Sequence, residues 1–246
     1  MIKVRDLHFS YNGMEILRGI DFKAGTGEFI AILGPNGAGK STFVKCLVGI
    51  VRCKGVEILG RPMGEYSPRE LARAVAYVPQ RVGRGFMTVF DTVLLGRRPY
   101  MGLTPSREDL KTVENALRRL GIEHLALKRT NEISGGELQK VSIARALAQG
   151  ARILVLDEPT NNLDLKSQLE VVKLAKEFSE NGLSIVVMHD VNLALRFAGR
   201  FIFMKGGRIV ADGGREVLKP SLFREVYGVD VTIEEVRRGI PLVVPL

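Results

Sequence analysis

One short stretch leaves this chain few choices of fold. Residues 34–42 read Gly-Pro-Asn-Gly-Ala-Gly-Lys-Ser-Thr and match the pattern G-x-x-x-x-G-K-[ST] in full. Directly before it, residues 29–33 form an apolar run typical of a strand that is buried on both faces. A strand before this pattern and a helix after it form the arrangement in which a glycine-rich loop binds phosphate. The segment therefore predicts an α/β fold around a largely parallel sheet, with a phosphate site where this strand ends.

The loop carries the chemistry that nucleotide phosphates need. Its glycines let backbone N–H groups converge on phosphate oxygens, and the following helix N-terminus adds partial positive charge at the same point. We expect Lys40 to bridge the β- and γ-phosphates and Ser41 to supply a hydroxyl ligand to Mg²⁺. The residues expected to bind the nucleotide are Gly34, Pro35, Asn36, Gly37, Ala38, Gly39, Lys40, Ser41 and Thr42.

Two further apolar runs, residues 153–156 and 185–188, also end in polar side chains. Because the carboxyl ends of parallel strands meet at one edge of a sheet, these side chains are expected to lie near the loop. We expect Asp157 to hold Mg²⁺ through water and Glu158 to polarise an attacking water molecule. His189, after the second run, is expected to contact the γ-phosphate.

The periodicity elsewhere predicts one lobe inserted in another. Residues 2–33 are predicted to be strands, and residues 201–210 a hairpin around a Lys-Gly-Gly turn. Between the buried runs, about residues 82–149 are rich in helical periodicity. Within this stretch, apolar residues recur on one face between Ser106, a helix-start signal, and Gly121, a stop signal. We therefore expect a helical insertion there.

Composition narrows the class of protein. Apolar residues at 46% and charged residues at 26% are typical of a folded globular chain and exclude collagen, a disordered tail and a disulfide-stapled miniprotein. No apolar run approaches the roughly 18 residues that span a bilayer, and the first residues lack the apolar stretch of a secretory signal. The two cysteines, Cys46 and Cys53, have a spacing that matches no metal or redox pair, which indicates a reducing compartment.

The charge balance is basic. Lys plus Arg number 36 against 27 Asp plus Glu, so the net charge of +9 favours an acidic partner: nucleic acid, anionic lipid or a phosphorylated small molecule. Residues 215–246 form a tail of mixed basic and acidic residues. Charge alone does not choose among the three partners.

The start of one helix carries the clearest family resemblance. Ile133-Ser134-Gly135-Gly136-Glu137 precedes the helix that ends near Gln149, and Ser134 and Glu137 have the spacing of a capping box. This segment resembles the L-S-G-G-Q signature of the ATP-binding cassette (ABC) ATPases. The resemblance covers almost the whole chain in order: Tyr11, residues 34–42, Gln80, residues 134–139, Asp157-Glu158, Asn162-Leu163-Asp164 and His189.

The resemblance implies a fold and further site residues. It implies an α/β P-loop NTPase core with a mixed or parallel sheet, an antiparallel β-subdomain and an inserted helical subdomain, all in one domain. The implied division of residues 1–246 is a catalytic lobe at about 1–81 and 150–215, a helical signature subdomain at about 82–149 and a C-terminal extension at about 216–246. Tyr11 would stack on adenine, Gln80 would lie near Mg²⁺ and the attacking water, and Asp164 would belong to a loop that crosses a dimer interface.

The signature is expected to act between two copies of the chain. Ser134, Gly135 and Gly136 form a second anion-binding helix end, but it lies in the helical insertion rather than beside the phosphate loop. Two copies packed head to tail would each place this end on the γ-phosphate of the ATP held by the other. Glu137 stands where the family pattern has Gln, and we expect its carboxylate to turn back to the Ser134 N–H. Ile133 stands where the family pattern has Leu, and we expect this volume-conserving change to have no effect on function.

Two further segments are similar to one branch of the family. Residues 88–99 and the tail motif at residues 223–229 look like those of importers of iron-siderophores, haem and cobalamin. The resemblance implies an ATPase on the cytoplasmic face of the cell membrane, peripherally bound to an integral membrane permease and served by an extracytoplasmic substrate-binding protein. A molybdate or tungstate importer is the nearest alternative.

Two alternative functions are less favoured. An ABC ATPase that acts on nucleic acid or ribosomes would explain the positive charge, but such proteins generally have two cassettes or a long coiled-coil insertion, and this sequence has neither. It also lacks alternating aromatic and basic residues suited to base stacking, so no nucleic-acid partner is expected. A small-molecule kinase with the same phosphate loop would not need Ser134 or His189. The positive charge is better explained by a position beside the membrane.

Overall fold

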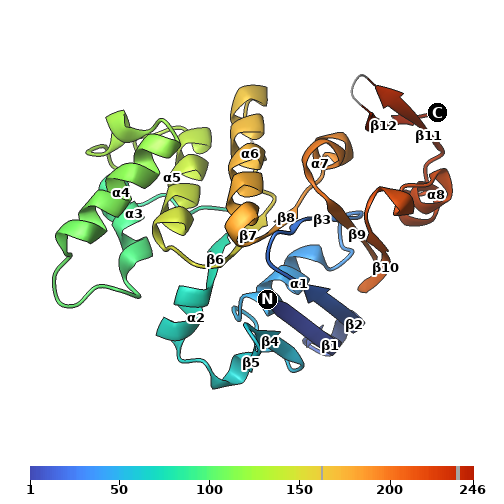
Figure 1. Cartoon of the computed structure of the whole chain (residues 1–246), viewed down its shortest axis with the longest axis horizontal. Coiled ribbons are helices and arrows are strands. Elements are labelled where there is room, and N and C mark those ends of the chain that lie inside the picture. Colours follow the sequence, from blue (N-terminus) through green and yellow to red (C-terminus); the bar gives the residue numbers. More distant parts are fainter. Residues whose placement is uncertain (162, 237–238) are drawn as a thin grey trace.

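The computed structural model describes residues 1–161, 163–236 and 239–246 and has a six-stranded sheet at its centre (Figure 1). In order across the sheet, the strands are β10 (Arg208–Gly213), β9 (Arg200–Lys205), β3 (Phe29–Leu33), β8 (Leu183–Val187), β7 (Ile153–Asp157) and β6 (Val75–Val78). Neighbouring strands from β9 to β6 pair in parallel, and β10 pairs antiparallel with β9. The expected mixed sheet is confirmed, and the three apolar runs are β3, β7 and β8.

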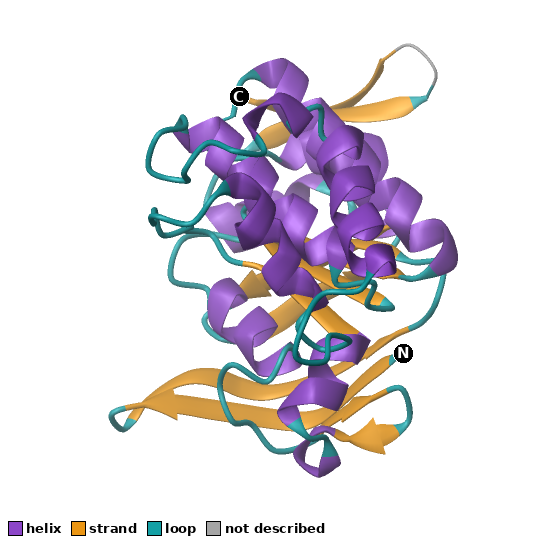
Figure 2. Ribbon diagram, turned by 90° about the vertical axis from the view of Figure 1, so that its left-hand side faces the viewer, coloured by secondary structure: helices purple, strands orange, loops and turns teal. Residues whose placement is uncertain are grey.

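Side-chain alternation along the buried strands divides the core in two. Ile30 and Ile32 face one cluster of buried apolar residues, whereas Phe29 and Leu33 face the other. The first cluster lies against the helix after the phosphate loop, a separate antiparallel sheet and Ala74, and the second lies against most of the other helices. Most of the helices lie above the antiparallel sheet in Figure 2. The helices that pack directly beside the central sheet include α1 (Lys40–Leu47), α6 (Leu165–Asn181) and α7 (Val191–Phe197).

The antiparallel sheet forms the lower edge of the molecule in Figure 1. Its order is β2 (Met14–Ala24), β1 (Ile2–Tyr11), β4 (Val56–Ile58) and β5 (Arg61–Pro62). The tight connection between β1 and β2 uses Asn12 and Gly13 at positive φ of 47° and 81°, which is the turn chemistry expected at this dipeptide. After β5, the chain forms the 3₁₀ turn η1 (Met63–Glu65) and helix α2 (Pro68–Ala74), which starts at a Ser67 capping box.

Between β6 and β7 the chain builds a group of helices at the left of Figure 1. They are α3 (Val89–Leu94), η2 (Leu95–Arg97), α4 (Arg107–Arg119), η3 (Glu123–Leu125) and α5 (Gly135–Ala148). Ser106 caps α4 and Gly121 follows its end at φ +64°, so both predicted helix signals are confirmed. Within the described ranges, no helix combines the length and apolarity required to cross a bilayer.

The C-terminal part adds elements that periodicity did not predict. The β9–β10 hairpin matches the expectation for residues 201–210. Beyond it lie η4 (Arg215–Val217), α8 (Pro220–Tyr227), β11 (Val231–Val236) and β12 (Ile240–Pro245). The side chain of Asn192 in α7 accepts from the Val243 N–H at 2.8 Å and donates to the Val243 carbonyl at 3.1 Å, which fastens this second hairpin to the core.

The cysteine expectation was wrong. Cys46 and Cys53 form a disulfide with a Cα–Cα distance of 5.7 Å. Cys46 lies near the end of α1, and the chain then turns back at Gly49, whose φ is +74°. This reversal brings two residues seven positions apart into contact, a proximity that a spacing pattern does not encode. The prediction of a reducing compartment therefore loses its basis.

Candidate nucleotide site

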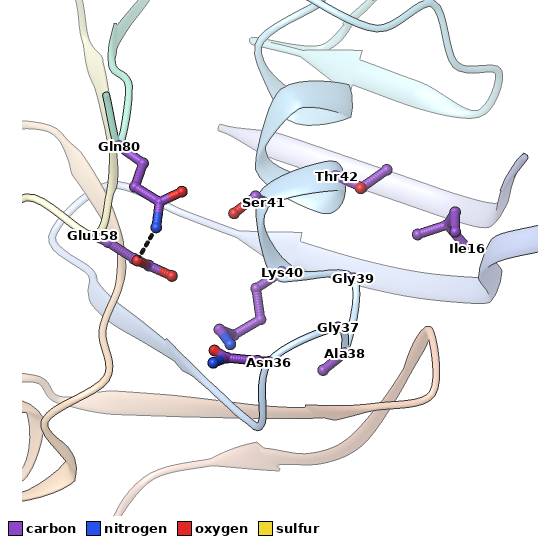
Figure 3. A pocket seen from close by; sticks show the side chains of 10 residues that line it. All are labelled: Ile16, Asn36, Gly37, Ala38, Gly39, Lys40, Ser41, Thr42, Gln80 and Glu158. Atoms are coloured by element: carbon purple, nitrogen blue, oxygen red, sulfur yellow. Dashed lines mark hydrogen bonds between the residues drawn. The ribbon is translucent and has the colours of Figure 1, made fainter. Parts of the chain in front are cut away.

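The phosphate loop connects the buried end of β3 to the first turn of α1. Gly37 and Gly39 both adopt positive φ, at 80° and 95°, which side-chain-bearing residues rarely do. Gly39 serves as the N-cap of α1, so the loop leads directly into a helix N-terminus. The loop opens onto a cavity (Figure 3). Its lining comprises Ile16, Asn36, Gly37, Ala38, Gly39, Lys40, Ser41, Thr42, Gln80 and Glu158.

Lys40 is only 5% exposed at the base of this cavity. Its Nζ donates to the carbonyl oxygens of Gly34 at 2.7 Å and Pro35 at 3.0 Å. Burial lowers the pKa of the Lys40 ammonium, and the nearby carboxylates of Glu158 and Asp157 oppose that shift. The ammonium is therefore held beside the loop by groups that a phosphate could replace.

Ser41 and Asp157 come together from α1 and β7. The Ser41 hydroxyl donates to Asp157 Oδ1 at 3.0 Å, and the Tyr77 hydroxyl donates to Oδ2 at 3.2 Å. Burial raises the pKa of Asp157, and the hydrogen bonds from Ser41 and Tyr77 oppose the rise. Burial likewise raises the pKa of Tyr77. Sequence reasoning missed Tyr77, because nothing in a strand of this kind marks one tyrosine as a partner of Asp157.

Glu158 lies at the centre of a group of side chains from three segments. Its Oε1 is 2.5 Å from His189 Nε2, and its Oε2 accepts hydrogen bonds from Asn161 Nδ2 at 2.7 Å and from Gln80. Figure 3 shows Gln80 and Glu158 facing Ser41 and Lys40 across the cavity. The fold thus brings together the three residues expected to act on water and γ-phosphate. Asn161 was not predicted, since its role depends on the turn after β7.

Tyr11 is not part of the cavity wall. Its side chain is 46% exposed at the end of β1, and its ring packs edge-on against Phe9 with centroids 4.7 Å apart. Ile16, on the neighbouring strand β2, lines the cavity instead. Ile16 also escaped prediction, because an apolar residue in an alternating strand carries no signal that it faces a ligand.

The signature segment lies apart from this cavity. Ser134 is the N-cap of α5, and Glu137 Oε2 accepts from the Ser134 N–H at 2.7 Å, so the predicted capping box is confirmed. The hydrogen bonds from Ser134 lower the pKa of Glu137. Ser134 and Gly135 are exposed, Gly136 is partly exposed, and none of this segment contributes to the cavity lining of its own chain.

Asp164 is exposed as well. It caps α6 by accepting from the Ser167 N–H at 2.9 Å, and it is absent from the cavity lining. Asn162, the first residue of the Asn-Leu-Asp triplet, lies outside the described residues. The site therefore divides into a cavity at the carboxyl edge of the sheet and two exposed helix starts elsewhere on the surface.

Comparison with known families decides what this arrangement is. Residues 17–161, which include the phosphate loop, the signature and the Asp-Glu pair, match the family model described as ABC transporter. The chain belongs to the ABC transporter family. It is accordingly an ATP-binding ABC ATPase that hydrolyses ATP.

Two relatives cover nearly the whole length of this ABC ATPase. An uncharacterized ABC transporter ATP-binding protein of Methanocaldococcus jannaschii is 51% identical over 250 residues, covering 100% of this chain and 98% of that protein. The hemin import ATP-binding protein HmuV of Deinococcus radiodurans is 38% identical over 242 residues, covering 95% of this chain and 92% of that protein.

Two solved ABC structures share the fold. A metal-chelate type ABC transporter in an inward-facing conformation superposes with a TM-score of 0.84 at 28% identity, covering 100% of this chain and 96% of that one. A dimeric ATP-binding cassette in a post-hydrolysis state, bound to ADP and phosphate, gives 0.78 at 28% identity, covering 87% of this chain and 98% of that one.

Proposed function

We propose that this ABC ATPase powers a membrane importer for a metal chelate such as haem, an iron(III)-siderophore or cobalamin. The observation that carries the proposal is the similarity to a hemin import ATP-binding protein along almost the entire chain. The segments at residues 88–99 and 223–229, which look like those of metal-chelate importers, support it independently of the nucleotide site. A molybdate or tungstate importer is the second candidate.

Nucleotide binding is assigned to the loop and its neighbours. Residues 34–42 would surround the phosphates of ATP, with the Lys40 ammonium on the β- and γ-phosphates. Tyr11, exposed at the end of β1, would stack on adenine. Mg²⁺ suits the oxygen ligands gathered at this edge, the Ser41 hydroxyl and the Asp157 carboxylate, with Gln80 nearby. When bound there, Mg²⁺ would neutralise charge on the phosphates.

Hydrolysis is assigned to Glu158 as the base that orients and deprotonates water, with His189 contacting the γ-phosphate. The contacts of Glu158 with Gln80 and His189 support these roles, because they place both expected partners at the Glu158 carboxylate. Asn161 adds a further hydrogen bond to the same carboxylate. Water must displace one of these partners to reach the carboxylate. Gln80, on the exposed segment after β6, is the partner that we expect to move away.

A second copy of the chain would complete the site. Ser134, Gly135 and Glu137 begin a helix whose exposed N-terminus suits an anion, and Gly136 adds little bulk there. Packed head to tail, this end and Asp164 of each copy would meet the ATP held by the other. Solved dimers of a similar cassette support the arrangement. ATP would then join the two copies, and its hydrolysis would release them.

The segment between β6 and α4 suits contact with a permease. It exposes apolar side chains together with arginines, a combination favourable at protein interfaces. These side chains are Arg81, Arg84, Phe86, Met87, Leu95, Arg98 and Leu103. We place the ATPase peripherally on the cytoplasmic face of the membrane, with an extracytoplasmic substrate-binding protein on the other side and no nucleic-acid partner. The net charge of +9 is compatible with anionic lipid nearby.

Reconstitution with the permease in liposomes tests the importer function. Binding proteins loaded with haem, a ferric siderophore, cobalamin or molybdate are added in turn, and phosphate release is measured. We expect one of the three metal chelates to stimulate hydrolysis. Stimulation by molybdate alone would favour the second candidate, and salt-sensitive DNA binding without any stimulation would reject an importer.

The nucleotide assignment has its own test. Lys40→Ala should weaken MgATP binding by about 10- to 100-fold, the usual loss for a charge-assisted hydrogen bond. Calorimetric titration measures the effect, with Lys111→Ala on the exposed side of α4 as the control. Unchanged ATP affinity in Lys40→Ala would remove the phosphate role from this lysine.

A further inference from the structure

The turn between β9 and β10 contacts the phosphate loop through its backbone. It consists of Gly206 and Gly207, both at positive φ, 55° and 81°, as a two-residue hairpin turn of this kind requires. The Gly207 N–H donates to the Ala38 carbonyl at 3.1 Å, and the Gly207 carbonyl accepts from the Arg18 N–H at 3.0 Å. One residue thus joins the phosphate loop to β2, the strand that carries Ile16 to the cavity wall.

Position 207 has no room for a side chain. A Cβ there would lie 2.1 Å from the Ile16 carbonyl oxygen, far inside van der Waals contact. A Cβ on Gly39 would lie 3.3 Å from the same oxygen and 3.6 Å from Gly207 Cα. The Ile16 backbone therefore packs between a glycine of the phosphate loop and a glycine of the turn. At Gly206, by contrast, no described atom lies within 4 Å of the Cβ position.

The hydrogen bond from Gly207 fixes the direction of one peptide group in the loop. The peptide between Ala38 and Gly39 is trans, and the C=O and N–H of a trans peptide point in opposite directions. Because the Ala38 carbonyl points to the turn, the Gly39 N–H points away from it. Gly39 lines the cavity and is the N-cap of α1, where backbone N–H groups suit phosphate oxygens.

The turn is held by contacts outside the cavity. Phe203 of β9 pairs in register with Leu33, the last residue of β3 before the loop, and β10 pairs with β9. Lys205, directly before the turn, donates to the Glu225 carbonyl in α8. Neither glycine of the turn is among the residues that line the cavity, so a nucleotide bound there would not compete for these contacts.

We infer that Gly207 is a positioning residue for nucleotide binding: its N–H orients the peptide between Ala38 and Gly39, and its lack of a side chain lets β2 pack against the phosphate loop. The inference rests on the nucleotide role proposed for that loop. It assigns a part in ATP binding to a turn that contributes no residue to the cavity lining among those described.

Gly207→Ala tests this assignment, because the added methyl group would push the turn away from Ile16 and Ala38. We expect MgATP and MgADP each to bind about two- to tenfold more weakly by calorimetry, since a loop that lacks one hydrogen bond adopts its binding shape less often. The turnover number at saturating ATP should change by less than about twofold, because bound ATP still faces Glu158. A purely structural role would lower the melting temperature and leave the affinity of the folded protein unchanged.

Gly206→Ala is the matched control. Gly206 belongs to the same turn and also has positive φ, so alanine introduces the same kind of backbone strain without a contact to β2. This variant should melt at a lower temperature than wild type and bind MgATP with wild-type affinity. Wild-type affinity in folded Gly207→Ala, or an equal loss in Gly206→Ala, would overturn the inference.

A backbone ester decides the question if Gly207→Ala does not fold. Glycolic acid placed at position 207 by cell-free translation replaces the donating N–H with an oxygen atom and adds no side chain. We expect this protein also to bind MgATP about two- to tenfold more weakly, and wild-type affinity would overturn the inference. The proposed role of the loop fails separately, only if Lys40→Ala retains wild-type ATP affinity.

Discussion

Glu158 occupies a conformation that its side chain disfavours. Its φ is 50°, in the left-handed region, which costs a residue with a Cβ roughly 1 kcal/mol or more. The backbone is held there by a hydrogen bond from its N–H to the Val187 carbonyl at 3.1 Å. The turn aims the carboxylate back over the sheet edge toward His189 and Gln80. Strain of this kind is typical of residues placed for chemistry.

Glu158→Gln should separate ATP binding from hydrolysis. The amide keeps the shape of the side chain, but it cannot take a proton from water, so we expect phosphate release to slow by about 10²- to 10⁴-fold. MgATP affinity measured by calorimetry should stay within about threefold of wild type, because Lys40 and the loop supply the binding.

Glu177→Gln is a suitable control for this variant. It removes a carboxylate from α6 that, in the part of the chain that the structure describes, pairs only with the exposed Arg119, at 3.3 Å. Exposed pairs contribute little to stability, so this variant should hydrolyse ATP at the wild-type rate. Wild-type turnover in Glu158→Gln as well would assign the base to another residue.

Asp157 carries a charge that the folded protein tolerates poorly. Because burial raises the pKa of this carboxyl above its ordinary 3.8, ionised Asp157 destabilises the fold at neutral pH. Asp157→Asn should therefore melt at a higher temperature than wild type at pH 7, yet lose Mg²⁺-dependent hydrolysis. The gain should shrink as the pH falls toward 4, where the wild-type carboxyl takes up a proton in both folded and unfolded states.

Thermal melts of both proteins between pH 4 and 8, in EDTA, measure this difference. A melting temperature for Asp157→Asn that is below wild type at every pH would mean that its hydrogen bonds with Ser41 and Tyr77 outweigh the cost of burial.

The sequence predicts best those elements that have a long apolar run or clear start and stop residues. The buried strands β3, β7 and β8 were found because their apolar runs are followed by polar residues, and α4 because Ser106 and Gly121 mark its ends. The short strands β4 to β6 and the elements after β10 were not found, since a few residues carry no readable period. Their positions depend on neighbours that are distant in the chain.

The site divides in the same way. The motif residues of the site were predicted because their chemistry and spacing recur. Ile16 and Tyr77 reach the site only through packing of separate elements, and Asn161 only through the turn after β7. Sequence patterns locate the phosphate loop but not the groups that hold it.

The disulfide between Cys46 and Cys53 should stabilise the segment that follows the phosphate loop. It closes a short loop from the end of α1, and Cys46 is fully buried. Cys53→Ser should lower the free energy of unfolding by about 2 kcal/mol in non-reducing buffer, through the greater entropy of the unfolded chain. Denaturant titration with and without dithiothreitol measures this loss.

Reduction of the wild-type protein is the matched comparison. Dithiothreitol should lower wild-type stability to near that of Cys53→Ser and leave the variant unaffected. Two reactive thiols in denatured, never-reduced wild-type protein would contradict the pairing.

The two helix N-termini proposed to bind phosphate lie in different places on the molecule. The N-terminus of α1 opens into the cavity, whereas the N-terminus of α5 is exposed on the helical part of the chain and touches no part of that cavity. A single copy therefore leaves the second end unused. Because the N-termini of α1 and α5 are separated in one copy, a head-to-tail dimer is the arrangement in which both could contact the same nucleotide.

Ser134→Arg tests the use of α5 by a second copy. We expect the variant, combined with Glu158→Gln to prevent hydrolysis, to bind MgATP as a monomer with unchanged affinity but to form no ATP-dependent dimer in light-scattering chromatography. The bulky guanidinium would fill the space meant for the partner's γ-phosphate. Loss of the Ser134 cap should also lower the free energy of unfolding by about 1 kcal/mol, so the test needs a control variant that loses a similar cap.

Ser106→Arg provides that control, because Ser106 caps α4 with the same capping-box geometry and lies outside the proposed interface. It should lose similar stability and still dimerise with ATP. If both variants dimerise, the exposed end of α5 does not meet the partner's nucleotide. If neither dimerises, the cap rather than the contact is at fault, and action between two copies loses its support. If Ser134 contacts the partner directly, Ser134→Arg should fail to dimerise and Ser106→Arg should dimerise normally.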